Sequence, residues 1–171
     1  MKKIALILLT CLLVSATGFT QKFGFVDTEY ILSNIPAYKA AQDKLDQFSK
    51  EWENEIKAMY EEVDKLYRKY QSEQVLLTQD MKSKREEEII SLEKQVKELQ
   101  NKYFGVEGEL FQKRQELVKP IQDQIYNAIK ELATEGGYAA IFDTSEGVSL
   151  IFSDPKYDKS DEVLKKLGYK N

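Results

Sequence analysis

"IISLEKQVKELQNKYFGVEGEL", residues 89–110, carries apolar residues at alternating steps of three and four. The members of this series are Ile89, Leu92, Val96, Leu99, Tyr103, Val106 and Leu110. Such a repeat is typical of a helix that packs against another helix along one narrow seam. An earlier series with helical spacing runs from Ala41 to Tyr70 and drifts once, around Trp52. The sequence therefore predicts two long helices that pack on each other.

The two predicted helices are separated by "LLTQDM", residues 76–81, which contains neither Gly nor Pro. Helices in this order can fold back as an antiparallel hairpin or continue as one very long helix. We favour a hairpin over residues 36–119, with its tip near 75–81, because a continuous rod would separate the two end segments of the chain. At 1.5 Å per residue, about 40 helical residues make an arm roughly 60 Å long.

Three residues are expected to make this arm flexible. Gly105 and Gly108 each cost about 1 kcal/mol relative to alanine in a helix interior. Pro120 removes one helical hydrogen bond, which predicts a bend near residues 116–120. The alternative interpretation is that the glycines allow the two helices to approach closely, or that the helix simply tolerates them. If they soften the arm, replacing both with alanine should stiffen and stabilise it.

The two ends of the chain carry a different pattern. Residues 22–36, "KFGFVDTEYILSNIP", predict a strand and a short helical turn, and residues 138–152, "YAAIFDTSEGVSLIF", predict a β-hairpin around "TSEG". We expect residues 21–35 and 120–171 to form one small β-rich body, so that the fold class is α+β. A body of about 65 residues has little core of its own, which favours oligomerisation. Its apolar contact residues are expected to be Phe23, Phe25, Ile141, Phe142, Leu150 and Phe152.

Residues 1–20 have the pattern of a secretory signal peptide. Two lysines precede a mostly apolar run from Ile4 to Val14, and small residues follow. This run is shorter than the roughly 20 residues of a membrane span, although an uncleaved anchor is the alternative. Cys11 raises a second alternative, a lipoprotein, which Thr10 and the short apolar run disfavour. We expect export to a bacterial periplasm, cleavage before Gln21 and no stable membrane insertion afterwards.

The composition beyond residue 20 excludes several classes of chemistry. The chain has no histidine and its one cysteine is Cys11, so thiol nucleophiles, histidine catalysis, disulfides and the common zinc ligand sets are absent. Without the two lysines of the leader the net charge falls from −4 to −6, which gives no electrostatic footprint for nucleic acid. Asp27, Asp143 and Asp154 near strand ends are interpreted as turn caps rather than a catalytic pair. We expect no enzymatic activity, no metal and no cofactor.

Several stretches together resemble one known family. They are the leader, "KFGFVDTEYIL" at 22–32, the charged hairpin, "IQDQIYNAIKELATEGGYAAIFDTSEGVSLIF" at 121–152 and "YDKSDEVLKKLGY" at 157–169. In this order they resemble the OmpH/Skp family of periplasmic chaperones over essentially the whole chain beyond residue 20. The resemblance implies a homotrimer joined through its bodies, with three helical arms around a cavity that holds unfolded outer-membrane proteins without ATP. The best-studied type of member is strongly basic whereas this chain is acidic, so we do not transfer a lipopolysaccharide site.

Five apolar residues of the hairpin lie beside its seam. Tyr60 and Tyr67 are one heptad apart on the first helix, and Ile90, Phe104 and Phe111 follow one line on the second. They either widen the contact between the helices, pack where the arm meets the body or, as the resemblance implies, line a client cavity. We predict the last of these roles. The alternative function is an envelope spacer or adaptor, whose arm would bury its apolar residues and bind a folded partner.

Overall fold

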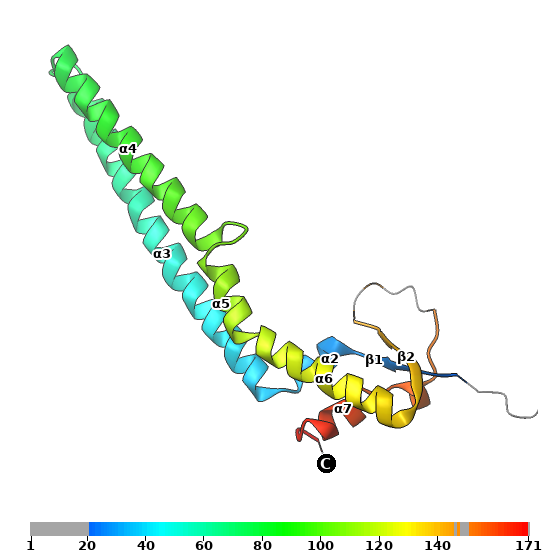
Figure 1. Cartoon of the computed structure of the whole chain (residues 1–171). Coiled ribbons are helices and arrows are strands. Elements are labelled where there is room, and N and C mark those ends of the chain that lie inside the picture. Colours follow the sequence, from blue (N-terminus) through cyan, green and yellow to red (C-terminus); the bar gives the residue numbers. More distant parts are fainter. Residues whose placement is uncertain (1–20, 146, 148–150, 171) are drawn as a thin grey trace, which may run out of the picture. The chain divides into compact units, whose positions relative to one another are not determined.

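A computed structural model describes residues 21–145, 147 and 151–170, so the predicted leader lies outside the described residues. In chain order the elements are β1 (Lys22–Val26), α2 (Thr28–Ser33), α3 (Pro36–Glu73), α4 (Gln79–Phe104), α5 (Glu109–Leu117), α6 (Lys119–Gly136), β2 (Tyr138–Asp143), the 3-10 helix η1 (Pro155–Tyr157) and α7 (Ser160–Lys166). They form two compact units (Figure 1). We name Leu32–Gln124 the arm, and the described residues before and after it the body. The predicted α+β class, a helical hairpin with a small sheet made by both chain ends, is confirmed.

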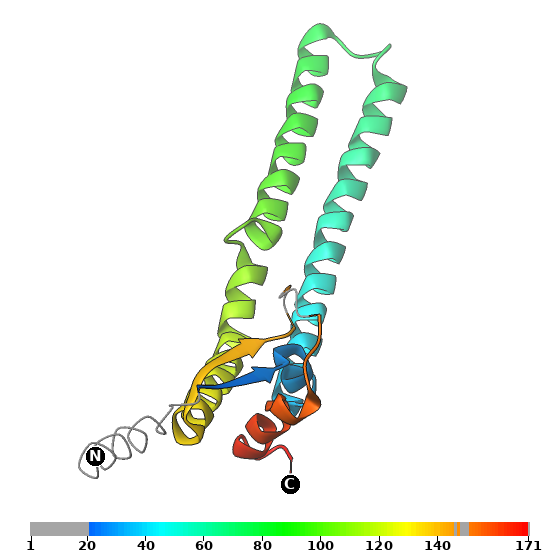
Figure 2. The same ribbon diagram turned by 90° about the vertical axis from the view of Figure 1, so that its right-hand side faces the viewer.

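The arm contains an antiparallel helical hairpin. α3 begins with Pro36, whose missing N–H is no loss in a first turn, and runs without interruption to Glu73. Thr78 caps α4, because its Oγ1 accepts a hydrogen bond from the N–H of Met81 at 3.4 Å. α3 and α4 run side by side in opposite directions from the turn that joins them (Figure 2). The hairpin is therefore confirmed over the continuous rod.

The seam between α3 and α4 forms the core of the arm. Its buried residues are Ile56, Val63, Ile89, Val96 and Tyr103, and half-buried Trp52, Met59, Leu66, Tyr70, Leu92, Leu99 and Phe104 pack against them. Two tyrosine hydroxyls fix the register of the helices, since Tyr103 donates to Glu55 at 2.8 Å and Tyr70 donates to Glu86. Each of these hydrogen bonds to a carboxylate raises the pKa of its tyrosine.

The second helix of the arm is interrupted by a four-residue loop. α4 ends at Phe104, residues 105–108 leave the helix (Figure 1), and α5 begins at Glu109. The prediction of Val106 as a seam residue is wrong, because its side chain is 94% exposed. Gly105 and Gly108 cap the two helices, so the prediction that they lie in a helix interior is wrong as well.

Close approach of backbone to backbone explains both glycines. A Cβ on Gly105 would collide with the carbonyl oxygen of Asn101, and one on Gly108 would lie 2.8 Å from the carbonyl oxygen of Tyr103. Both glycines have negative φ angles that any residue can adopt, so space rather than conformation selects them. Alanine at position 105 or 108 therefore destabilises this loop. The expectation that both replacements stabilise the arm applied to a helix interior and does not hold for the looped structure.

A second interruption separates α5 from α6 at Val118. Pro120 lies in the first turn of α6, where it cannot donate the hydrogen bond that a continuous helix would direct to Glu116. The helix is therefore interrupted within residues 116–120, the range in which a bend is predicted. At its other end α6 stops at Gly136, and Gly137 adopts a left-handed φ of 66° that favours glycine.

Among the described residues, the body has one two-stranded parallel sheet, which joins the two ends of the chain. β1 pairs with β2 in a register that places Phe23 beside Ala140 and Phe25 beside Phe142. The second strand of the predicted β-hairpin falls on residues 148–152. Of these, 148–150 lie outside the described residues, and 151 and 152 belong to no strand.

Asp143, at the end of β2, links that strand to the start of α2. Its carboxylate accepts hydrogen bonds from the backbone N–H and the hydroxyl of Thr28, at 3.2 and 2.6 Å. It also accepts from the N–H and the hydroxyl of Ser145, at 3.0 and 2.8 Å. Burial alone would raise the pKa of Asp143, but these hydrogen bonds outweigh burial and lower that pKa.

The C-terminal helix α7 is joined to β1 by a buried serine. The hydroxyl of Ser160 accepts from the N–H of Asp27 at 2.9 Å and donates to Asp158 at 2.6 Å. Val163 and Leu164 of the same helix are fully buried. Polar contacts at strand ends and a small apolar core therefore hold the body together.

The lowered pKa of Asp143 predicts how the stability of the protein changes with pH. A carboxylate with a lower pKa in the folded chain stabilises the fold above its unfolded value of 3.8, and this contribution is lost as the pH falls through the folded value. Asp143→Asn should lower the free energy of unfolding by about 1 to 2 kcal/mol at neutral pH, because hydrogen bonds to an ionised group are lost. Urea denaturation at fixed protein concentration, from neutral pH to about pH 3, should also show a weaker acid dependence in the variant.

Asp64→Asn provides the matched control. Asp64 pairs with Arg68 at 2.9 Å on the exposed side of α3, and such pairs contribute less than about 1 kcal/mol. Equal losses of stability in the two variants would contradict the role assigned to Asp143.

Candidate functional site

A shallow groove lies on one face of the arm. It is lined by Glu53, Ile56, Lys57 and Tyr60 from α3 and by Gln100 and Phe104 from α4. The groove thus brings together two of the predicted site residues, Tyr60 and Phe104, from different helices. The ring of Tyr60 is about half exposed, whereas Phe104 packs partly against the core of the seam.

Phe104 is supported by a cluster of aromatic side chains. Trp52 stacks on Tyr103, with ring centroids 4.7 Å apart, and meets Phe104 edge-on at 6.2 Å. Phe48, one turn earlier on α3, stacks on Trp52 at 5.6 Å. Stacked and edge-on arrangements are the favourable geometries for aromatic rings. Phe104 is therefore a fixed wall of the groove, and its ring is less exposed than its position off the seam predicted.

Two further site residues extend this face toward the turn of the hairpin. Tyr67 follows Tyr60 by one heptad and Ile90 precedes Phe104 by two, so the heptad repeat places both on the face of the groove. Tyr67 is half exposed and Ile90 is 62% exposed. We name Tyr60, Tyr67, Ile90 and Phe104 the groove face.

Phe111 does not continue the line of the groove face. The heptad step from Phe104 to Phe111 crosses the loop, which takes four residues out of the helix. Phe111 is about half exposed on α5. It is therefore an accessible aromatic residue, but it lies on a different line of the helix surface from Phe104.

The turn of the hairpin exposes apolar residues that the sequence analysis did not select. Val75 and Leu76 are almost fully exposed there, and Met81 at the start of α4 is half exposed. The sequence signal was available, since adjacent apolar residues in a turn have no seam in which to pack. "LLTQDM" was interpreted only as an interruption between helices.

Charged residues beside the groove face neutralise one another. The pairs within single helices include Lys57–Glu61 at 4.0 Å, Asp64–Arg68 at 2.9 Å and Lys94–Glu98 at 3.7 Å. Exposed pairs of this kind contribute little to stability. They leave no large excess of one sign, so a ligand of the groove face would gain mainly from apolar contact.

The body presents a second apolar surface, around its sheet. The ring of Phe142 lies near those of Phe23 and Phe25, with centroids 6.2 and 5.9 Å apart. Phe23 and Phe142 are each more than one-third exposed, while Phe25 and Ile141 are partly buried. Phe152 is largely exposed, and Leu150 lies outside the described residues. The predicted contact residues Phe23, Phe25 and Phe142 are thus brought together.

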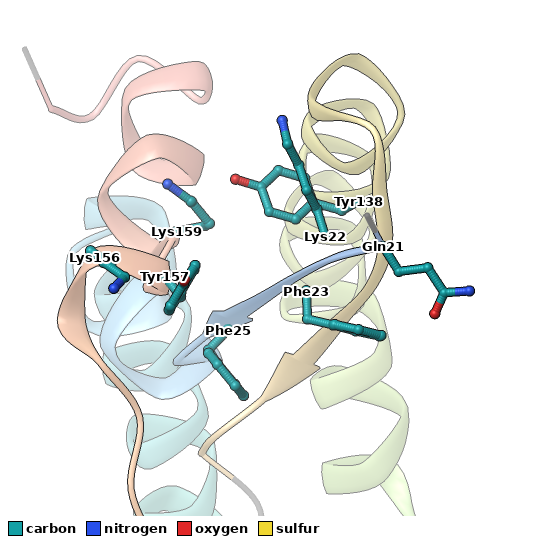
Figure 3. Close-up of a pocket in the computed structure, with 8 residues that line it drawn as sticks. All are labelled: Gln21, Lys22, Phe23, Phe25, Tyr138, Lys156, Tyr157 and Lys159. Carbon is teal, nitrogen blue, oxygen red and sulfur yellow. The ribbon is translucent and has the colours of Figure 1, made fainter. Parts of the chain in front are cut away.

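A pocket opens beside β1 (Figure 3). Its lining consists of Gln21, Lys22, Phe23, Phe25, Tyr138, Lys156, Tyr157 and Lys159. All three lysines have polar partners, since Lys22 donates to the Gly136 carbonyl at 3.1 Å, Lys156 pairs with Asp154 at 2.7 Å and Lys159 pairs with Glu162 at 2.6 Å. The pocket is therefore not a ready-made anion site.

The three aspartates near strand ends cap turns. Asp27 accepts from the N–H of Tyr30 at 2.9 Å, Asp154 accepts from the N–H of Lys156 at 3.1 Å, and Asp143 binds Ser145 as described above. Within the part of the chain that the structure describes, no group of three or more Asp, Glu, His or Cys residues is placed to hold a metal ion. No helix in that same part is both long and apolar enough to cross a membrane.

Comparisons with known proteins match this architecture. A family model described as outer membrane protein (OmpH-like) matches residues 22–167. The chaperone protein Skp of Vibrio cholerae is 26% identical over 164 residues, which cover 94% of this chain and 91% of that protein. A Caulobacter crescentus protein described as an OmpH-like outer membrane chaperone has a crystal structure that matches with a TM-score of 0.68 at 11% identity, over 88% of this chain and 85% of that one, and so shares the fold. This chain therefore belongs to the family of OmpH-like outer membrane proteins that its sequence resembles.

Proposed function

We propose that this protein is a periplasmic holdase chaperone, which binds unfolded outer-membrane proteins and prevents their aggregation without ATP. The observation that carries the proposal is the groove face, where large apolar side chains stay exposed because the hairpin has no third helix to cover them. Family membership supports it, since the Vibrio cholerae relative is named a chaperone.

Weak apolar contacts suit a holdase. Full burial of a large apolar side chain contributes roughly 1.5 to 3 kcal/mol, and a residue that is already half buried can contribute only part of this. Several such contacts on one arm can hold a client through effective concentration, although each of them breaks quickly. The sequence has no glycine-rich phosphate loop, and release through weak contacts needs no nucleotide.

Assembly would increase the number of contacts. We propose a homotrimer joined through the exposed phenylalanines of the body, with the groove faces of three arms available to one client. The small core of the body supports this, because a unit of this size buries little apolar surface alone. The signal-peptide pattern of residues 1–20 supports a periplasmic location.

The adaptor function predicts a different surface. A rod that binds one folded partner would bury its seam and present charged side chains, whereas Tyr60, Tyr67 and Ile90 are exposed on this arm. The groove face therefore favours a client without fixed shape.

An aggregation assay tests the proposed function. A urea-unfolded outer-membrane β-barrel protein is diluted into buffer with the mature protein, and light scattering is followed. We expect the scattering to be suppressed at a ratio of about one trimer per client molecule, in the absence of nucleotide. Unchanged scattering, together with tight binding to a single folded partner, would support the adaptor instead.

The groove face itself is tested by a triple variant, Tyr60→Ser, Tyr67→Ser and Ile90→Ser. These side chains lie outside the buried seam, so helicity should be retained while the client is held about tenfold more weakly, which corresponds to about 1.4 kcal/mol. Client retention is measured by the rate at which a fluorescent client exchanges. The control is Lys65→Ser, Gln71→Ser and Glu87→Ser, which alters exposed polar residues without changing net charge. Equal retention in both variants would exclude the groove face as the binding surface.

The proposed assembly is tested by Phe142→Ser. Because Phe142 lies beside Phe23 and Phe25 on the exposed surface of the sheet, the variant should dissociate at concentrations where the wild type is trimeric. Sedimentation velocity gives the mass, and circular dichroism shows whether the arm remains helical. A wild-type protein that sediments as a monomer would contradict the trimer.

A further inference from the structure

The loop in the arm removes close to one turn of helix. An α-helix has 3.6 residues per turn, and residues 105–108 are four. A helix that skips four residues changes phase by only about 40°. The apolar stripe of α4 can therefore continue on α5 although the loop separates them.

The two leucines of α5 fit the seam with or without the loop. In an uninterrupted helix, the alternation of three and four after Tyr103 places Val106, Leu110, Lys113 and Leu117 on the seam. With four residues looped out, Leu110 takes the place of residue 106 and Leu117 takes the place of residue 113, which are also seam positions. Both leucines are partly buried in the structure. The sequence of the arm is thus compatible with two registers.

Specific contacts stabilise the looped register. Lys102 Nζ lies 3.3 Å from Glu109 Oε1 across the loop, and Gln112 Nε2 donates to the carbonyl oxygen of Glu107 at 3.3 Å. In a continuous helix residues 102 and 109 would be about 10 Å apart along the axis, so their ion pair would be lost. That loss would be balanced by the helical hydrogen bonds of residues 106–109 and by burial of Val106.

We propose that residues 105–108 form a register switch: the loop can be taken up into one continuous helix, which moves α5 along α3 by about one turn. A shift of four residues corresponds to about 6 Å, and shifts of one turn between packed elements are an established type of conformational change. The exposed Val106 then returns to the seam position that its heptad specifies. Use of the switch to fit clients of different size rests on the proposed function, whereas the existence of two registers does not.

The glycines provide a way to choose the register. Alanine at 105 or 108 collides with backbone atoms in the loop, but it favours a helix interior over glycine. Gly105→Ala with Gly108→Ala should therefore convert the arm to the continuous register. Deletion of residues 105–108 should keep α5 where it is, because Glu109 then follows Phe104 directly. Val106→Pro should also keep the looped register, since proline opposes a continuous helix and Gly105 already has the extended backbone that precedes proline.

Spin-label distances measure the register directly in the mature chain, which has no cysteine of its own beyond residue 20. Labels at Gln47→Cys on α3 and Gln115→Cys on α5 measure the distance that the shift changes. Labels at Glu62→Cys on α3 and Glu93→Cys on α4 measure, as a control, a distance that the shift leaves unchanged. Labelled protein is mixed with an excess of unlabelled protein, so that an oligomer rarely contains two labelled chains. The measured distances are then those within one chain. We expect the double alanine variant to change the first distance by up to about 6 Å and leave the second unchanged. The deletion and proline variants should show the wild-type distances.

Hydrogen exchange gives an independent readout of the same switch. Amides 106–108 should exchange at least tenfold more slowly in the double alanine variant than in the wild type, because they become helical. The proposal is overturned if the double alanine variant keeps the wild-type distance, or if its arm unfolds, since a second register would have rescued it. It is also overturned if the deletion variant fails to fold. Client capture is measured separately, so that loss of chaperone activity with an intact switch counts against the proposed function alone.

Discussion

Two helices that pair through a single seam can bury only one stripe of each, and the surface of the arm follows from this constraint. Tyr103 and Tyr70 lie in the seam, where their rings pack and their hydroxyls reach glutamates of the facing helix. Tyr60 and Tyr67 lie one position outside the seam and stay half exposed. A third helix would cover them, as in a larger bundle, but the hairpin has none. The same residue type is therefore structural on one stripe and available for contact on the next.

The body is built on a different principle, because its strands come from opposite ends of the chain. Parallel pairing of β1 with β2 requires a long connection, and all the residues of the arm lie within it. So small a unit gains little from apolar burial, and polar contacts at the strand ends add specificity. Asp143 binds α2 to β2, and Ser160 binds α7 to β1. The exposed phenylalanines on the sheet are the apolar surface that this arrangement leaves uncovered.

Much of the arm could be predicted from the sequence because heptad spacing is a pattern of residues close to one another in the chain. Heptad spacing predicted two paired helices and the seam residues from Ile89 to Tyr103, and Pro120 predicted a bend in the range where the helix is interrupted. The loop at 105–108 could not be predicted in this way. Four residues nearly equal one turn, so the heptad pattern continues across the loop and places Val106 on a seam that it does not occupy.

Other features depend on contacts between distant residues. The parallel partner of β1 lies more than 100 residues away, and nothing in "YAAIFD" shows whether this strand pairs with β1 or with residues 148–152 in a local hairpin. The exposure of Phe104 was overestimated for the same reason, because Trp52 on the other helix covers part of its ring. Val75 and Leu76 lie in the turn beyond the end of the seam, so heptad spacing does not select them.

The loop and the groove meet at one side chain. Phe104 is the last residue of α4, a wall of the groove and a partner of Trp52, and the backbone that leaves the helix at Gly105 begins directly after it. Lys113 of α5 lies over the ring of Phe48, which stacks on Trp52, so a change of register of α5 would alter the support of the groove. Linkage makes such coupling reciprocal, so a ligand that packs on Phe104 more favourably in one register must favour that register by the same free energy. If the groove receives clients and the loop changes register, each client therefore selects the arm that fits it, without any input of chemical energy.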